Sequence, residues 1–172
     1  MRTFSGSLSM LHVIGAIALA MAAIWPAAAA ASPTKGRAAI NTLERAEVVR
    51  INRFRHAHGL SRLTINTKLN RSANWLGRDM ASKDYFSHTD SLGRRPDKRM
   101  EESGNYPANA WHAENLASGY RNAESTFEQW RDSPEHREIL LSPNYRVIGI
   151  ALVYNADSRY GWYWAADFGS VR

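Results

Sequence analysis

Glu114 lies in the stretch 111–120, where its neighbours are mostly small or apolar residues. Such a stretch is too hydrophobic to be a surface loop, so we expect the carboxylate to be buried. A buried carboxylate is costly unless a cation, a metal ion or several hydrogen-bond donors meet it. We expect His88 and His136 to be its partners. Because both are distant from Glu114 in the sequence, only the fold can bring the three together.

Two imidazoles and a carboxylate can hold a divalent metal and leave one position open to water. We therefore predict His88 and His136 as metal ligands. Glu114 could then be a third ligand, a residue that orients a histidine, or the catalytic base that acts on bound water. Asn115 could satisfy backbone groups at the strand end or donate into the cleft. A metal-free alternative is that the histidines only tie helices to a sheet, or that Arg137 pairs with Glu114.

Other catalytic signatures are missing from the sequence. The chain contains no cysteine, which excludes a cysteine nucleophile, a thiolate metal site and disulfide bonds. It also lacks a Gly-x-Ser-x-Gly elbow, a His-Glu-x-x-His motif and a glycine-rich phosphate loop. The net charge of +6 favours anionic envelope surfaces. The arginines are scattered, so we expect no nucleic-acid partner.

The first residues of the chain are typical of a secretory signal. Arg2 supplies the positive charge, an apolar segment follows, and a run of alanines offers cleavage sites. We predict a cleaved signal peptide over residues 1–31, a linker over 32–40 and one folded domain over 41–172. The apolar segment is short for a membrane span. We therefore expect a secreted or periplasmic protein with no stable membrane anchor after cleavage.

The hydrophobic periodicity predicts helices first and strands late. Helices are expected over residues 42–58, 67–83, 94–102, 123–130 and 134–141, with Asn41 and Asn66 as caps and Pro134 opening the last. We expect a strand that carries Glu114 and ends at Gly119, and two further strands over 145–154 and 160–168 that form an antiparallel hairpin. The arginines of the first helix, Arg45, Arg50, Arg53 and Arg55, are expected to form a solvated face. This order indicates an α+β domain with helices packed on a small sheet.

Four motifs occur together in one order along the chain. They are Phe86-Ser87-His88, the segment 114–117 (Glu-Asn-Leu-Ala), the segment 130–137 and the segment 163–169. In this order the sequence resembles bacterial CAP-domain (SCP-like) proteins, whose superfamily includes cysteine-rich secretory proteins, insect venom antigens and plant pathogenesis-related proteins. The resemblance extends from about residue 43 to residue 169.

The resemblance implies a three-layer α-β-α sandwich with a cleft lined by two histidines and two acidic residues. His88, Glu114 and His136 match three of these four positions, and the histidine pair can bind a divalent metal such as zinc in some members of the superfamily. The fourth position departs from the pattern, because Ser133 stands where the family has a glutamate. The sterol-binding loop of eukaryotic members depends on cysteines and is not implied.

Two functions follow as expectations. The first is an exported CAP domain that recognises an envelope or extracellular ligand through a cleft formed by His88, Glu114, His136 and Asn115, with or without a divalent metal. The second is a metal-assisted hydrolase in which His88 and His136 are ligands and Glu114 is the base. A third possibility is that these polar residues only stabilise the fold.

Overall fold

The computed structural model describes residues 40–170. The predicted signal peptide and all of the predicted linker except Ile40 lie outside the described residues. The elements, in order, are α1 (Thr42–Ala57), β1 (Thr64–Ile65), α2 (Thr67–Lys83), α3 (Pro96–Glu102), β2 (His112–Ser118), α4 (Ala123–Asp132), α5 (Pro134–Leu141), β3 (Val147–Tyr154) and β4 (Trp162–Gly169).

Local signals explain where these helices begin. The Asn41 side chain accepts a hydrogen bond from the Glu44 backbone N–H, and the Glu44 carboxylate accepts one from the Asn41 N–H, which completes a capping box. Asn66 caps α2 in a similar way, and Pro134 is the first residue of α5. All three predicted starts are confirmed.

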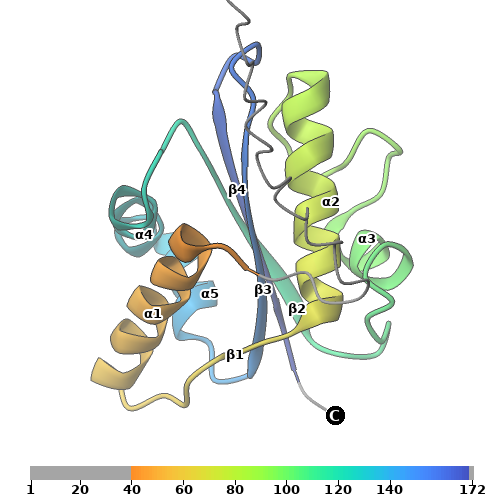
Figure 1. Ribbon diagram of the computed structural model, residues 1–172. Helices are drawn as coiled ribbons and strands as arrows, with labels where there is room; N and C mark the ends of the chain where they lie inside the picture. The colour runs from red at the N-terminus through yellow and green to blue at the C-terminus, as the bar shows by residue number, and fades with distance from the viewer. Residues whose placement is uncertain (1–39, 171–172) are drawn as a thin grey trace, which may run out of the picture. The chain divides into compact units, whose positions relative to one another are not determined.

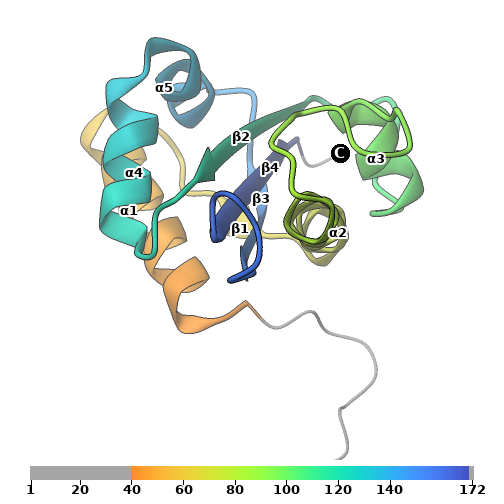
Figure 2. The same cartoon turned by 90° about the horizontal axis from the view of Figure 1, so that it is seen from above.

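The elements form three layers. Figure 2 shows α1, α4 and α5 on one face of the sheet and α2 and α3 on the other. The strand order is β1-β3-β4-β2, in which β1 is parallel to β3 and the other pairs are antiparallel. The predicted α-β-α sandwich and the β3–β4 hairpin are therefore confirmed. The strand β2, which carries Glu114, lies at an edge of the sheet.

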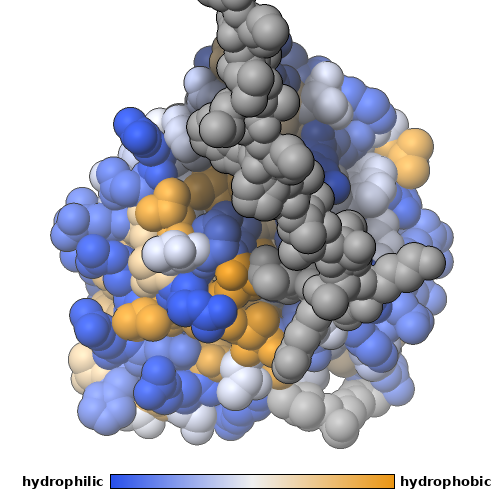
Figure 3. Space-filling view, viewed as in Figure 1, coloured by the Kyte–Doolittle hydropathy of each residue, from blue (hydrophilic) through white to orange (hydrophobic). Residues whose placement is uncertain are grey.

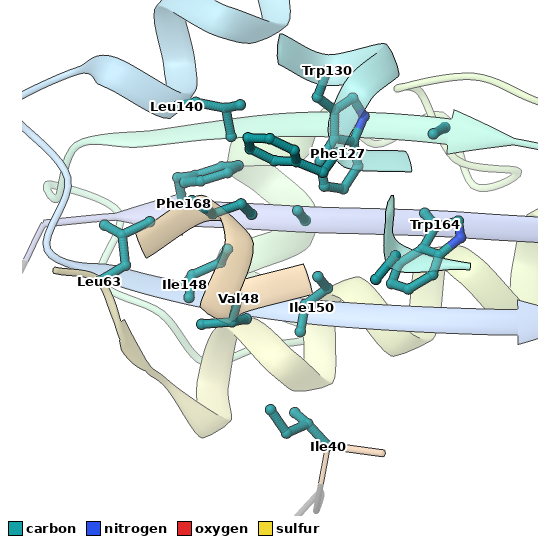
Figure 4. Close-up of a cluster of buried hydrophobic side chains, with 14 residues drawn as sticks. Ile40, Val48, Leu63, Phe127, Trp130, Leu140, Ile148, Ile150, Trp164 and Phe168 are labelled. Atoms are coloured by element: carbon teal, nitrogen blue, oxygen red, sulfur yellow. The ribbon is translucent and has the colours of Figure 1, made fainter. Parts of the chain in front are cut away.

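The two helical layers pack on the sheet in different ways. On one face, Trp130 and Phe127 of α4 meet Leu140 of α5, and Phe168 of β4 lies against the same cluster (Figure 4). On the other face, α2 approaches β3 at Gly149. A Cβ atom at Gly149 would lie 2.1 Å from the Leu69 carbonyl carbon, so only glycine permits this contact.

Some of the arginines of α1 lie on the solvated outer face of the helix, as predicted. Arg45 and Arg53 are exposed, and Arg50 lies 3.7 Å from the Glu124 carboxylate. Apolar residues also reach the surface on the α1 side of the face in Figure 3, among hydrophilic ones. The helix therefore presents a mixed surface.

The prediction that Arg55 belongs to the solvated face is wrong, because its side chain is fully buried. Its guanidinium donates to the backbone carbonyls of Ser61, Leu140, Ser142 and Tyr145, at 2.7 to 3.2 Å. Carbonyl dipoles thus replace the water that a charged group would otherwise need. Arg55 connects the end of α1 to the segment between α5 and β3.

Glu47 is a buried acid on the inner side of α1. Its carboxylate oxygens have no hydrogen-bond partner among the described residues, and burial raises the pKa from 4.5 to about 9, although the charge of Arg50 opposes the shift. A carboxyl whose pKa is higher in the folded state favours folding when protonated. This contribution is complete below pH 4.5 and is lost as the pH rises toward about 9.

We expect Glu47→Gln to raise the free energy of unfolding at pH 8 by about 2–4 kcal/mol, because the neutral amide removes the cost of deprotonation. At pH 4 the two proteins should be nearly equally stable. Urea unfolding at both pH values measures the difference. Glu138→Gln, at an exposed position of α5, is the matched control and should change little at either pH. An equal gain for both variants would contradict the assignment.

Candidate functional site

Glu114 lies at the centre of a buried polar cluster at the β2 edge of the sheet. Its side chain is only 1% exposed. One carboxylate oxygen, Oε1, lies 2.7 Å from His88 Nδ1, and the other, Oε2, pairs with the guanidinium of Arg99. The predicted contact between His88 and Glu114 is therefore present.

Arg99 is the cation that sequence reasoning missed. It is fully buried on α3, and besides binding Glu114 it donates from Nη1 to the His88 backbone carbonyl at 2.9 Å. It therefore fixes both the carboxylate and the loop that carries the histidine. The prediction that Arg137 could pair with Glu114 is wrong: its guanidinium lies 5.3 Å from the centre of the Phe54 ring instead.

The geometry of the pair defines which side of His88 is available. The Nδ1 atom faces the carboxylate and donates to it, so Nε2 is the ring nitrogen that this contact leaves for a ligand. The His88 side chain is 55% exposed, although Glu114 beneath it is buried. A ligand can therefore reach this imidazole while the carboxylate orients it from below.

His136 lies on α5 and approaches the cluster from the opposite helical layer. Its Nδ1 lies 2.8 Å from the Ser133 hydroxyl, and its backbone carbonyl accepts from Asn115 Nδ2 at 3.1 Å. Burial lowers the pKa of His136, and the charge of His88 lowers it further, with Glu135 opposing. The contact with Asn115 ties His136 to β2, the strand that carries Glu114. No hydrogen bond joins His136 to Glu114 among residues 40–170.

Ser133 and Asn115 both contact His136, one through its imidazole and the other through its backbone carbonyl. Ser133 precedes α5 as its N-cap residue and orients the His136 ring. Asn115 is fully buried, and its amide fixes the backbone at His136. Of the two roles open for Asn115, the structure supports the contact with backbone. At Ser133, a hydroxyl contacts the imidazole where the family pattern has a carboxylate.

Asp167 is a second acidic residue that sequence reasoning missed. It lies opposite Glu114 in the β2–β4 register and is fully buried. Burial and the negative charge of Glu114 raise the pKa of Asp167 well above its usual range, while Arg99 and Ser72 oppose the shift. The raised pKa favours the protonated form of Asp167, and Arg99 pairs with Glu114 beside it. An acidic residue within the apolar run of β4 was the available signal.

A cleft of about 300 Å³ opens above this cluster. Its lining includes His88, Glu114 and His112, together with Arg95 and Asp97 at the start of α3. The Nδ1 atom of His112, like that of His88, has a hydrogen-bond partner: it lies 3.0 Å from the Ala110 carbonyl oxygen. The cleft is thus lined by the imidazoles of His88 and His112 and by one exposed arginine, and its size suits a small polar group. His136 is not among its lining residues.

The residues fit a divalent metal only in part. The Nε2 atoms of His88 and His136 are suitable donors for zinc. Both oxygens of Glu114 are already engaged by His88 and Arg99, so this carboxylate does not offer a third ligand. Within the described range, no group of three or more His, Cys, Asp or Glu side chains is arranged to hold a metal.

Comparison with known proteins places this cleft in a family context. The model of CAP, the cysteine-rich secretory protein family, matches residues 48–168. The Bacillus subtilis protein YkwD is 31% identical over 120 residues, which cover 70% of this chain and 46% of YkwD. The B. subtilis membrane protein YlbC is 30% identical over 101 residues, which cover 59% of this chain and 29% of YlbC. The chain thus spans less than half the length of either relative.

Solved structures have the same fold. An outer surface protein from Borrelia burgdorferi superposes with a TM-score of 0.65 at 24% identity, over 77% of this chain and 97% of that one. An extracellular SCP-domain protein from Bacillus anthracis gives a TM-score of 0.62 at 21% identity, over 74% of this chain and 41% of that one.

Among the described residues, no helix has the length and apolar composition that a membrane span requires. The match to the family model extends across α1 to β4 and includes all the residues of the cleft. With the sequence relatives and the shared fold, it shows that this cysteine-free chain belongs to the CAP family.

Proposed function

We propose that this protein is exported and binds an envelope or extracellular ligand in the cleft at His88, with His136 as the second imidazole. The observation that carries the proposal is the contact of 2.7 Å between His88 Nδ1 and Glu114, which directs Nε2 of an accessible imidazole toward a ligand. The signal-like N-terminus and the surface or extracellular location in the names of two structural relatives support export.

The contacts of Glu114 favour binding over hydrolysis. A general base needs a free oxygen within reach of the proton that it removes. Both oxygens of Glu114 are occupied, and its side chain is almost fully buried. The metal-assisted hydrolase remains the second candidate, supported by the lowered pKa of His136, which favours the neutral imidazole that a metal binds.

Zinc is the first probe of the paired imidazoles. In calorimetric titration of the purified, metal-stripped protein, one zinc site with a Kd of about 1 µM or tighter, corresponding to about 8 kcal/mol, would support a metal shared by His88 and His136. His88→Ala and His136→Ala should each weaken binding at least about a hundredfold. His56→Ala, at an exposed position of α1, is the matched control and should bind as the wild type does.

The outcomes separate the candidates. Equal binding by the His56 and His88 variants would contradict a shared imidazole site. If the wild type bound no zinc, a zinc site at the two histidines would be excluded. Recognition would then be tested directly by retention of the protein on isolated envelope fragments, which His88→Ala should abolish. Turnover of cell-wall or peptide substrates that His88→Ala abolishes would favour the hydrolase.

A further inference from the structure

A second, larger groove lies away from the histidine cleft, and the two share no lining residue. Its volume is about 810 Å³, and the elements that line it are α2, the start of α1, the end of β3 and the residue after α3. This volume is within the range of sites that hold drug-sized ligands. The groove is not used by the function proposed above.

One face of α2 supplies most of the groove. Arg71, Asn74, Trp75 and Arg78 recur at helical spacing, so their side chains line the same side. The guanidinium of Arg94 lies 4.4 Å from the centre of the Trp75 ring and is itself fixed by Asp90 at 2.8 Å. The indole is thus held in place while it remains partly exposed.

The two acids of the groove are already engaged. Glu44 accepts from the backbone N–H groups of Asn41 and Leu152. Asp79 accepts from Ser91 and pairs with Lys83 at 2.9 Å. Burial would raise the pKa of Asp79, but the hydrogen bonds, that from Tyr85 foremost, outweigh it and lower the pKa to about 2. These carboxylates are therefore committed to neighbouring donors.

The two arginines of the groove have fewer hydrogen-bond and ion-pair partners than its acids. Arg78 is exposed and has no hydrogen bond or ion pair with another residue of the described range. Arg71 gives one guanidinium nitrogen to the Gly104 carbonyl at 2.7 Å and keeps its other donors. The indole N–H of Trp75 also has no acceptor among the described residues. The groove therefore offers two guanidinium groups and an aromatic ring with a free donor.

We propose that this groove binds an acidic saccharide, a sugar chain that carries carboxylates. Arginine recognises carboxylates by paired N–H donors, and a partly exposed indole provides a flat apolar surface and a donor for a sugar ring. Apart from Trp75 and Leu152, the residues that line the groove carry polar side chains, which can donate to or accept from sugar hydroxyls. The basic charge of the chain agrees with an anionic ligand.

The test is calorimetric titration of the purified protein with trigalacturonic acid, beside maltotriose as the neutral trisaccharide. We expect a Kd below about 1 mM for the acidic sugar and binding at least about tenfold weaker for the neutral one. Arg78→Gln should weaken acidic-sugar binding at least about tenfold. Arg159→Gln, which removes the same charge at an exposed position of the β3–β4 turn, is the matched control and should not.

Two further measurements locate the site. The indole N–H resonance of Trp75, assigned by its loss in Trp75→Phe, should shift on titration, and His88→Ala should bind the sugar unchanged. Equal losses in the Arg78 and Arg159 variants would show a diffuse charge effect and overturn the proposal. So would equal binding of maltotriose, equal binding of triglutamate, or no binding of trigalacturonic acid at about 10 mM.

Discussion

Replacing Arg99 with methionine is expected to lower the free energy of unfolding by about 3–5 kcal/mol, because it leaves a buried carboxylate without its cation. Arg99 is fully buried, and the Glu114 side chain that it pairs with is 1% exposed. Asp167, also fully buried, lies directly across the strand pair. Without the guanidinium, two acids would share an apolar interior with no positive charge between them.

The same substitution should also disturb the candidate site. Arg99 donates to the His88 carbonyl at 2.9 Å, so its loss frees the loop that presents the imidazole. We therefore expect weaker zinc or ligand binding in Arg99→Met even under conditions where the variant is folded. Urea unfolding at pH 7 measures the stability, and calorimetry measures the binding.

A double variant separates the ion pair from simple packing. Arg99→Met combined with Glu114→Gln removes both charges and should be more stable than Arg99→Met alone. Lys98→Met, on the same helix but 52% exposed, is the matched control and should change the free energy of unfolding far less. If the double variant were as unstable as the single one, the stabilisation would come from packing of the arginine stem.

Replacing Arg55 with methionine is the second large expected effect, a loss of about 3–4 kcal/mol in the free energy of unfolding. The substitution keeps an apolar stem but leaves four backbone carbonyls without their donor. Each buried acceptor left unsatisfied costs about 1–3 kcal/mol, and some will find water. Arg55→Lys should recover only part of the loss, because one ammonium group cannot reach all four oxygens.

The loss should be localised as well as global. Hydrogen exchange at residues 140–146, where three of the four carbonyls lie, should become faster in Arg55→Met. Urea unfolding measures the stability change, with Arg53→Met at an exposed position of the same helix as the control. A change within about 1 kcal/mol of that control would mean that these carbonyls do not depend on Arg55.

Prediction from the sequence worked best where the structure is local. Asn41 and Glu44 are three residues apart, so the capping box is visible in the sequence and is present in the structure. The β3–β4 hairpin joins neighbouring segments and was also predicted. The helix predicted over 67–83 is α2, and its buried residues recur with the period of a helix.

Membership of the CAP family and the pairing of His88 with Glu114 also followed from the sequence, through motifs in a fixed order. The residues that balance the charge of Glu114 could not be predicted from the sequence. Arg137 is adjacent to His136 in sequence, yet α5 directs it to Phe54. Arg99 meets Glu114 because α3 packs against β2, and nothing near either residue indicates that contact.

The sequence by itself therefore determined the helix starts at Asn41, Asn66 and Pro134, the β3–β4 hairpin and the family, because each of these depends on neighbours or on a motif. The tertiary structure alone decided which charges meet. It brings Asp167 beside Glu114 across two strands and buries Arg55 among carbonyls from distant segments. Burial and proximity set the cost of a charge, and both are properties of the packed chain.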